Sequence, residues 1–312
     1  MYTETDRKHI LGDPTYDRQF WDVMRGSRAP NEILRGGYSN ATGGYELPST
    51  SNRKYHEFLL AESNFRKLAN VLTIKGKDER LWARTCNDLA MWVPEGGKIP
   101  LRDSMADFTR YVLGKHKLAT AFKLDQDIIF EPGFNVEDYL LRRLAKNFAL
   151  AEDDAFINGT DENMPTGILA DQGGAEIGVT ATALTYEDIA KLFFSVKPEY
   201  RNDGVWMMND ETAYALRTLK DECGNYIWNH SNDTILGKKV CICNAMPSAG
   251  TGTKPIAFGD FSYYWIVDRA PVNLQPLVEE YALYDQVGYV GFEFLDARLI
   301  RPEAIKVIQI TG

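Results

Sequence analysis

The chain has 312 residues, with 35 lysines and arginines against 44 aspartates and glutamates, so its formal net charge is −9. The length predicts about two lobes, and the 44% hydrophobic and 25% charged fractions exclude wholesale disorder, a collagen-like repeat and a disulfide scaffold. The acidity argues against a protein whose main activity is to grip nucleic-acid phosphates.

Residues 1–54 predict an N-terminal arm. Glycine and proline are dense there, and the only helical pattern is a short one around Tyr16, Phe20, Val23 and Met24. No apolar run follows Met1, so we expect no secretory signal and four reduced cysteines. Because such a segment cannot build its own core, we expect it to lie along something else or to move freely.

Residues 55–72 predict a short helix, and residues 73–123 predict strand-like segments that form a long hairpin. The hairpin carries charges on both faces, so we expect it to project from the body. A turn-forming sequence marks its tip: Pro94, Glu95, Gly96, Gly97 and Lys98.

The clearest predicted helix covers residues 135–157, with Asn135 as its N-cap. Its apolar stripe repeats at helical spacing through Val136, Leu140, Leu144 and Phe148. Three carboxylates follow near its negative C-terminal end, where they require cations from elsewhere in the fold or from a neighbour: Glu152, Asp153 and Asp154.

Two further helices are expected to start at Thr185 and at Asp210. Short strand-like runs follow over residues 239–243, 255–258, 263–267, 289–298 and 304–310. Strands and helices do not alternate regularly, so the fold class is α+β.

The candidate catalytic and metal motifs are weak. Cys241 and Cys243 share a strand face, and Cys223 and His230 are near in sequence, but the spacing is unlike that of a zinc site and favours buried thiols. No histidine lies in a Gly-x-Ser-x-Gly or His-Glu-x-x-His motif. The stretch 250–254 lacks the order of a phosphate loop. We therefore expect no catalytic residue, no metal and no cofactor.

An ordered series of segments resembles the central signature of the tailed-bacteriophage major capsid proteins, which have the Hong Kong 97-type fold. The likeness covers roughly residues 55–312 and follows segments 117–125, 136–160, 165–169, 206–210, 216–221, 236–240, 246–247, 256–261 and 301–308. The signature residues carried over are Glu152, Asp153, Ala155, Phe156, Gly159, Pro165, Gly167, Gly259, Asp260, Arg301, Pro302 and Ala304.

The resemblance implies a layout for the subunit. Residues 1–54 would be the N-arm, 55–72 a short helix entering the peripheral domain, and 73–115 the extended E-loop, which overlaps an adjacent subunit. Residues 116–224 would form the peripheral domain with spine helix 135–157. Residues 225–295 would form the axial domain, and residues 296–312 would return to the peripheral domain.

The resemblance also implies a function. Hexamers and pentamers of the chain would tile an icosahedral shell around double-stranded DNA, which the wall encloses without sequence-specific binding. Portal and scaffolding proteins are expected partners, a decoration protein is a further candidate, and no membrane is involved. The protein would be assembled in the host cytoplasm and reside in the virion, as a structural protein and not an enzyme.

Two departures from the family pattern matter. Only about thirty residues precede Pro30, so scaffolding is expected to come from a separate protein or from a segment that was removed. Lys98 is a conceivable cross-linking lysine, but neither of its partners aligns by motif, so we predict no covalent cross-link.

Two alternatives remain open from the sequence. The first is an encapsulin-like compartment of the same fold that loads an enzyme cargo. The second is of a different class, a soluble α+β enzyme or ligand-binding protein, which would form only small oligomers.

Overall fold

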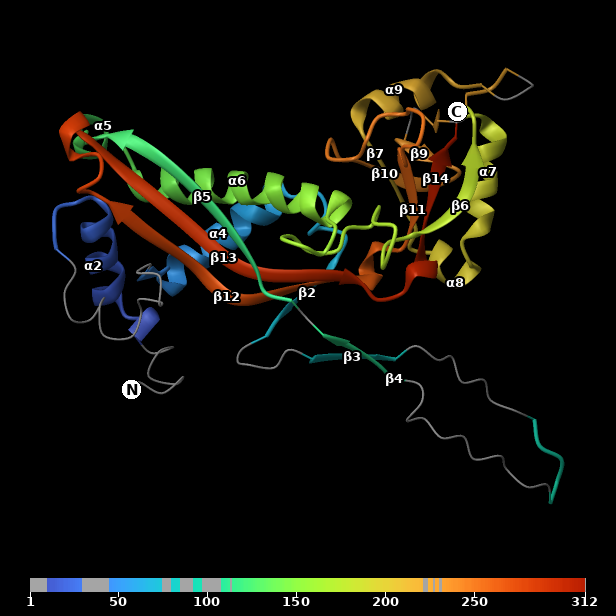
Figure 1. Cartoon of the computed structure of the whole chain (residues 1–312), viewed down its shortest axis with the longest axis horizontal. Coiled ribbons are helices and arrows are strands. Elements are labelled where there is room, and N and C mark those ends of the chain that lie inside the picture. The colour runs from blue at the N-terminus through green and yellow to red at the C-terminus, as the bar shows by residue number, and fades with distance from the viewer. Residues whose placement is uncertain are drawn as a thin grey trace.

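The computed structural model describes residues 10–29, 45–74, 80–84, 92–96, 108–112, 114–220, 224–226, 228–229 and 232–311. Two sheets, each with helices packed on it, form two lobes that lie side by side (Figure 1). A two-stranded hairpin stands off from the body below the junction of the lobes (Figure 1).

The first lobe is built on a five-stranded sheet in the order β1–β12–β13–β5, with β2 paired to β12. The strands are β1 (Tyr45–Glu46), β2 (Asn70–Thr73), β5 (His116–Asp125), β12 (Tyr264–Leu277) and β13 (Gln286–Leu299). Only β2 runs parallel to its partner. The two strands β12 and β13 form a long antiparallel hairpin, which η3 (Ala282–Tyr284) closes and which lies at the centre of the sheet.

Helices cover one face of the first sheet. They are α2 (Pro14–Met24), α4 (Ser49–Glu62), α5 (Gln126–Phe130) and α6 (Val136–Asn158). The α6 helix starts where the Asn135 side chain accepts a hydrogen bond from the backbone N–H of Asp138. Figure 1 shows α4 and α6 lying along each other, and their buried side chains meet those of β5, β12 and β13.

The second lobe is built on a seven-stranded sheet in the order β6–β14–β11–β7–β10–β9–β8. The strands are β6 (Glu176–Ala181), β7 (Val205–Met208), β8 (Trp228–Asn229), β9 (Thr234–Ile235), β10 (Lys238–Ile242), β11 (Ile256–Gly259) and β14 (Ile305–Ile310). Its helices are α7 (Tyr186–Ser195), α8 (Pro198–Arg201) and α9 (Asp210–Thr218), of which α7 and α9 are capped by Thr185 and Asn209. Two short 3-10 turns, η2 (Phe261–Tyr263) and η4 (Pro302–Ala304), connect the sheets.

A shared apolar cluster joins the two lobes. Phe65 is fully buried, and its ring centroid lies 4.9 Å from that of Tyr264 and 5.6 Å from that of Phe156. The same cluster includes Met207 of the second sheet. The lobes are therefore packed on a common core and are not joined by a free linker.

The projecting hairpin consists of β3 (Arg80–Arg84) and β4 (Phe108–Val112), paired antiparallel. It lies within the 73–115 stretch expected to project, and Figure 1 shows it away from both sheets. Its root is tied to the junction of the lobes, because the Tyr111 hydroxyl donates at 3.0 Å to the carbonyl of Ile300, which directly follows β13.

The N-terminal segment differs from the arm that the sequence predicts, since α2 is part of the subunit core. Phe20 and Met24 are fully buried, and Trp21 donates from its indole nitrogen to the Ser51 hydroxyl at 3.1 Å. The Tyr289 hydroxyl donates to the Met24 carbonyl at 2.8 Å. The residues of 1–54 that flank α2 at 1–9 and 30–44 lie outside the described residues.

The helix expected over 55–72 lies instead at α4 (Ser49–Glu62). Its first turn is polar and gave no apolar signal, although Ser51 is buried. The helix cannot continue past Ser63, because the backbone N–H groups of Asn64 and Phe65 donate to the Asp153 carboxylate.

The two sheets also divide the chain differently from the expected boundaries at 225 and 296. Strands β12 and β13 belong to the first lobe with α6, and β14 belongs to the second. The second sheet also contains β6 and β7, which precede residue 225, because β14 pairs with β6 and β11 pairs with β7. The lobes are thus interleaved along the chain.

Candidate functional site

The acidic end of α6 lies at the centre of a buried charge network. Arg66 is 5% exposed, and its Nε and Nη2 each donate to one oxygen of Glu152 at 2.6 Å. Its Nη1 and Nη2 also donate to the Asp268 carboxylate at 3.0 and 2.9 Å. Burial lowers the pKa of Arg66, but the charges of Glu152 and Asp268 outweigh it and hold that pKa well above its usual value. The cation that the helix end requires therefore comes from within the subunit.

Glu293 of β13 adds a third carboxyl group to this network. It is buried, and its Oε2 accepts a hydrogen bond from the Tyr55 hydroxyl at 3.1 Å. Burial, followed by the nearby charge of Glu152, raises the pKa of Glu293 well above its ordinary value. The raised pKa favours the protonated form, which limits the negative charge that Arg66 must balance.

Asp153 holds the chain that follows α4. Its carboxylate accepts from the Ser63 hydroxyl at 2.6 Å and from the backbone N–H groups of Asn64 and Phe65 at 3.0 and 3.2 Å. These donors offset the unfavourable position of a carboxylate at a helix C-terminus. Glu152 and Asp153 therefore act as a structural clamp between α6 and the end of α4.

The turn after α6 requires glycine because two backbone segments touch. A Cβ atom at Gly159 would lie 1.9 Å from the Pro165 carbonyl oxygen, and one at Gly167 would lie 2.4 Å from the Ile157 carbonyl oxygen. The backbone N–H of Gly167 donates to the Gly159 carbonyl at 3.0 Å. Ala155 closes the helix, since its carbonyl accepts from the N–H of Gly159. Phe156 is buried in the cluster that joins the lobes.

The remaining signature residues build the crossing between the sheets. A Cβ atom at Gly259 would lie 2.1 Å from the Ala304 carbonyl oxygen, and the backbone N–H of Asp260 donates to that same oxygen at 3.0 Å. Pro302 occupies the start of η4. Arg301 donates to the Tyr200 hydroxyl at 2.8 Å. The signature is thus gathered at the lobe junction, although its members are far apart in sequence.

The spine stripe is buried against the first sheet. Val136, Leu140, Leu144 and Phe148 are each at most 1% exposed. Gly291 of β13 leaves room for Leu144, because a Cβ atom there would lie 2.3 Å from its Cδ1. These four residues hold the helix on the sheet.

The hairpin tip is solvent-exposed where the structure describes it. Pro94, Glu95 and Gly96 are exposed, and Gly96 has a φ of +76°, which suits glycine in a turn. Gly97 and Lys98 lie outside the described residues. The Trp92 side chain is entirely exposed, and Trp82 is 59% exposed. Tryptophan is enriched at protein interfaces, so the hairpin with its tip is a candidate contact surface.

Other large apolar side chains are exposed at the far ends of both lobes. Leu283 and Tyr284 of η3 are 96% and 73% exposed, and Phe130 of the neighbouring α5 is 53% exposed. In the second lobe, Tyr214 of α9 and Phe194 of α7 are 73% and 67% exposed. This distribution places apolar contact area at the extremities of the subunit.

Within the described residues, no group of histidine, cysteine, aspartate and glutamate side chains could hold a metal ion. Cys223 and His230 lie outside them. Burial raises the pKa of Cys241 to about 11 and that of Cys243 to about 12, so both thiols are poor nucleophiles. Among the described helices, none is long and apolar enough to cross a membrane.

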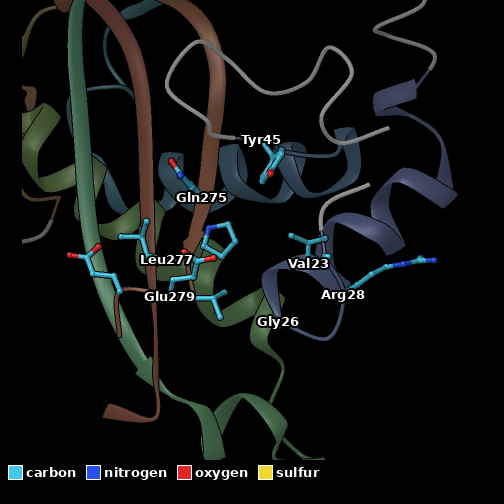
Figure 2. A pocket seen from close by; sticks show the side chains of 11 residues that line it. Val23, Gly26, Arg28, Tyr45, Gln275, Leu277 and Glu279 are labelled. Carbon is cyan, nitrogen blue, oxygen red and sulfur yellow. The ribbon is translucent and has the colours of Figure 1, made fainter. Parts of the chain in front are cut away.

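A hollow of about 630 Å³ lies between the end of α2 and the end of β12. Figure 2 shows Val23 and Leu277 on its opposite walls, with Arg28 and Glu279 near the rim. Among the residues that the structure describes, those that line the hollow include no histidine, cysteine or serine.

Known proteins resemble the chain in both sequence and fold. It is 29% identical over 147 residues to the "Probable major capsid protein gp17" of Mycobacterium phage D29. Its namesake in Mycobacterium phage L5 is 26% identical over 157 residues. These matches take in 46% of the chain and 45% and 46% of the relatives, so the alignment spans about half the length of each.

Solved capsid structures share the fold. The capsid of an empty GTA particle matches with a TM-score of 0.67 at 23% identity, covering 80% of this chain and 90% of that one. A virus-like particle from Pyrococcus furiosus matches with a TM-score of 0.53 at 13% identity, covering 83% and 98%. The fold is therefore the α+β capsid fold of Hong Kong 97 type. The sequence model of the phage capsid family matches residues 43–310, which is most of the chain, and the chain belongs to that family.

Proposed function

We propose that the chain is a major capsid protein that self-assembles as hexamers and pentamers into an icosahedral shell around the double-stranded DNA of a tailed phage. The family match over residues 43–310 carries this proposal. The names of the curated relatives and the capsid structures of the same fold support it. The protein acts as a structural component of the virion and not as an enzyme.

The proposed layout follows the two lobes. The first lobe, with spine helix α6, is the peripheral domain, and the second lobe is the axial domain that meets its copies at the five- and six-fold axes. The β3–β4 hairpin and its tip are the E-loop. Its exposed tryptophans, Trp82 and Trp92, are the contacts by which it reaches a neighbouring subunit.

Further partners belong to the same proposal. A portal protein occupies one vertex of the shell, and a scaffolding protein guides assembly in the host cytoplasm. A decoration protein on the outer surface of the shell is a further candidate partner. We also predict that no covalent cross-link joins the subunits. Denaturing electrophoresis of intact particles tests the last point, because ladders far above the 35.3 kDa of one chain would contradict it.

Negative-stain electron microscopy of the purified protein over a range of salt concentrations tests the function. We expect closed shells for the wild type. A variant with Trp82→Ser and Trp92→Ser is expected to fold with unchanged thermal stability and to form no shells. Its control is Leu60→Ser, which changes another exposed apolar residue on α4. Wild-type protein that yields only monomers or dimers would contradict the proposal.

The contents of the particles separate the proposal from an encapsulin-like compartment. Shells isolated from infected cells are expected to show the ultraviolet absorbance of nucleic acid. An enclosed protein cargo without DNA would favour the compartment instead.

A further inference from the structure

We infer that the exposed face of α6 beside α4 is a contact surface for the phosphate backbone of double-stranded DNA. The inference rests on the proposed function, because it assigns which surface of the shell subunit meets the enclosed duplex. It adds a binding site where the charge of the chain as a whole predicts none.

The surface is an open groove of about 490 Å³ between the two helices. Arg142, Arg143 and Lys146 of α6 line it and are exposed, whereas Glu62 of α4 is the one carboxylate among its lining residues. All three cations line the same groove, and Lys146 follows Arg142 by four residues and Arg143 by three, so its side chain neighbours both on the helix surface. The sign of the charge is locally reversed in a chain whose net charge is −9.

Neighbouring aromatic rings fix the two guanidinium groups. Arg142 lies 4.1 Å from the centroid of the Phe58 ring, and its Nε donates to Asp138 at 2.7 Å. Arg143 lies 4.9 Å from the centroid of the Phe122 ring and donates to the Tyr139 hydroxyl. Both groups are therefore held in place before a ligand binds, which lowers the entropy lost in binding a phosphate.

The same geometry favours a phosphate backbone over a protein partner. The guanidinium groups cover the faces of Phe58 and Phe122, so these rings are not available as apolar anchors. Apart from the covered Phe58 ring, the lining residues that offer apolar area are Ala61 and Tyr139, which is little for the apolar core of a protein interface. A DNA duplex instead offers closely spaced negative charge and needs only cations. Three cations per subunit give weak, salt-sensitive contacts that do not hold the duplex tightly.

The opposite face of the sheet provides a matched control. Lys115, Lys117 and Lys123 lie over the rings of Phe294, Phe292 and Tyr281, at 4.8, 4.6 and 5.8 Å from the centroids. Along β5, the residues buried under the helices are Phe122 and Leu124, so Lys117 and Lys123 face away from α6. This face also carries three exposed cations over aromatic rings, but outside the groove.

The test measures binding of a short fluorescein-labelled DNA duplex to the unassembled full-length protein by anisotropy, at a series of salt concentrations. The variant R142Q/R143Q/K146Q and the control K115Q/K117Q/K123Q remove the same charge. We expect the groove variant to lose at least about tenfold in affinity at low salt and its salt slope to fall by about 2.7, while the control keeps wild-type binding. The charge-conserving R142K/R143K is expected to keep the salt slope of the wild type but to bind less tightly, because lysine lacks the planar group that stacks on the rings.

Equal loss in both triple variants, or loss confined to the β5 control, would overturn the inference, because binding would then reflect total charge or the other face. If R142Q/R143Q/K146Q unfolds, R143Q/K146Q replaces it, since Arg142 then keeps its contacts with Phe58 and Asp138. Its salt slope is expected to fall by about 1.8.

Electron microscopy of the same samples tests the DNA-contact inference and the proposed shell function separately. Wild-type protein that forms shells but binds no duplex contradicts the inference and leaves the proposed function standing. Wild-type protein that forms no shells contradicts the proposed function. A groove variant that binds DNA normally but cannot assemble would identify the groove as a protein interface and overturn the inference.

Discussion

Arg66 holds Glu152 by a two-pronged contact, with Nε and Nη2 each 2.6 Å from a different carboxylate oxygen. The two residues are 86 positions apart, and both side chains are at most 3% exposed. The pair fastens the segment after α4 to the C-terminal half of the spine helix. Because Arg66 also binds Asp268 of β12, a single guanidinium links the segment after α4, the α6 helix and the first sheet.

Replacing Arg66 by alanine is expected to destabilise the subunit by about 3–5 kcal/mol, because it leaves buried carboxylates without their cation. Urea denaturation of the unassembled protein measures the change. Arg53→Ala is the control: Arg53 is 83% exposed and faces Glu57 at 3.9 Å, so its removal is expected to cost at most about 0.5 kcal/mol. Equal effects of the two changes would show that the buried network does not support the fold.

The pH dependence of stability is expected to reflect Glu293. Its folded-state pKa is raised well above the ordinary 4.5, so the folded protein binds a proton that the unfolded chain has released. Its contribution is fully present below pH 4.5 and is lost as the pH rises toward the folded-state pKa. Glu293→Gln mimics the protonated acid and is expected to remove this loss, by about 1.4 kcal/mol per pH unit.

Urea denaturation at several pH values above 4.5 measures the difference between wild type and Glu293→Gln. That difference is expected to move in favour of the variant as the pH rises. Glu279→Gln, at an exposed position, is expected to follow the wild type. Parallel curves for all three proteins would show that Glu293 titrates normally.

Gly159→Ala is expected to destabilise the subunit by about 3 kcal/mol or more, because a Cβ atom would lie 1.9 Å from the Pro165 carbonyl oxygen. The clash is with backbone, which cannot move without separating the turn from the helix end. Gly133→Ala, where a Cβ would meet nothing within 4 Å, is expected to change stability by less than about 0.5 kcal/mol. Thermal unfolding compares the two, and a stable Gly159→Ala protein would contradict the close approach.

Leu144→Ala is expected to cost about 2–5 kcal/mol, since it opens a cavity between α6 and the sheet. Leu150→Ala on the same helix removes a side chain that is 65% exposed and is expected to be nearly neutral for folding. The two changes alter the same residue type, so helix propensity cancels in the comparison. Similar losses of stability would mean that Leu144 is not a core residue in solution.

Removing residues 1–30 is expected to abolish folding of the isolated subunit. The deletion takes away α2, with the buried Phe20, Trp21 and Met24, and uncovers the apolar wall around Tyr289. Circular dichroism and size-exclusion chromatography of the truncated protein measure the effect. A truncated protein that is folded and monomeric would show that α2 is dispensable for the core.

The sequence predicts those parts of the fold whose signals are local. The starts of α6, α7 and α9 lie where a capping side chain precedes an apolar stripe: Asn135, Thr185 and Asn209 each accept a backbone hydrogen bond. The acidic end of α6 predicts that a cation is needed but not which one. Arg66 lies inside the stretch 55–72 for which the sequence predicts a helix, and nothing in that pattern indicates a buried ion pair, so only the fold reveals its role.

The expected domain boundaries at 225 and 296 differ from those of the two sheets, because the sheets are formed by pairing between segments that are distant in sequence. β14 pairs with β6, and the two are separated by more than a hundred residues that belong partly to the other lobe. No periodicity within a strand indicates which sheet it joins, because strands of both sheets bury side chains in the same way. The helix α2 is misjudged for a similar reason: its apolar residues are visible in the sequence, but the surface that covers them comes from Leu47, Tyr55 and β13.

Asp268 joins the root of the projecting hairpin to the rest of the subunit. Its carbonyl accepts from the backbone N–H of Ile74, where the chain leaves β2 for the hairpin, and its carboxylate binds Arg66. Arg66 in turn binds Glu152 on α6. A pull applied to the hairpin is thus carried through three residues into the long helix.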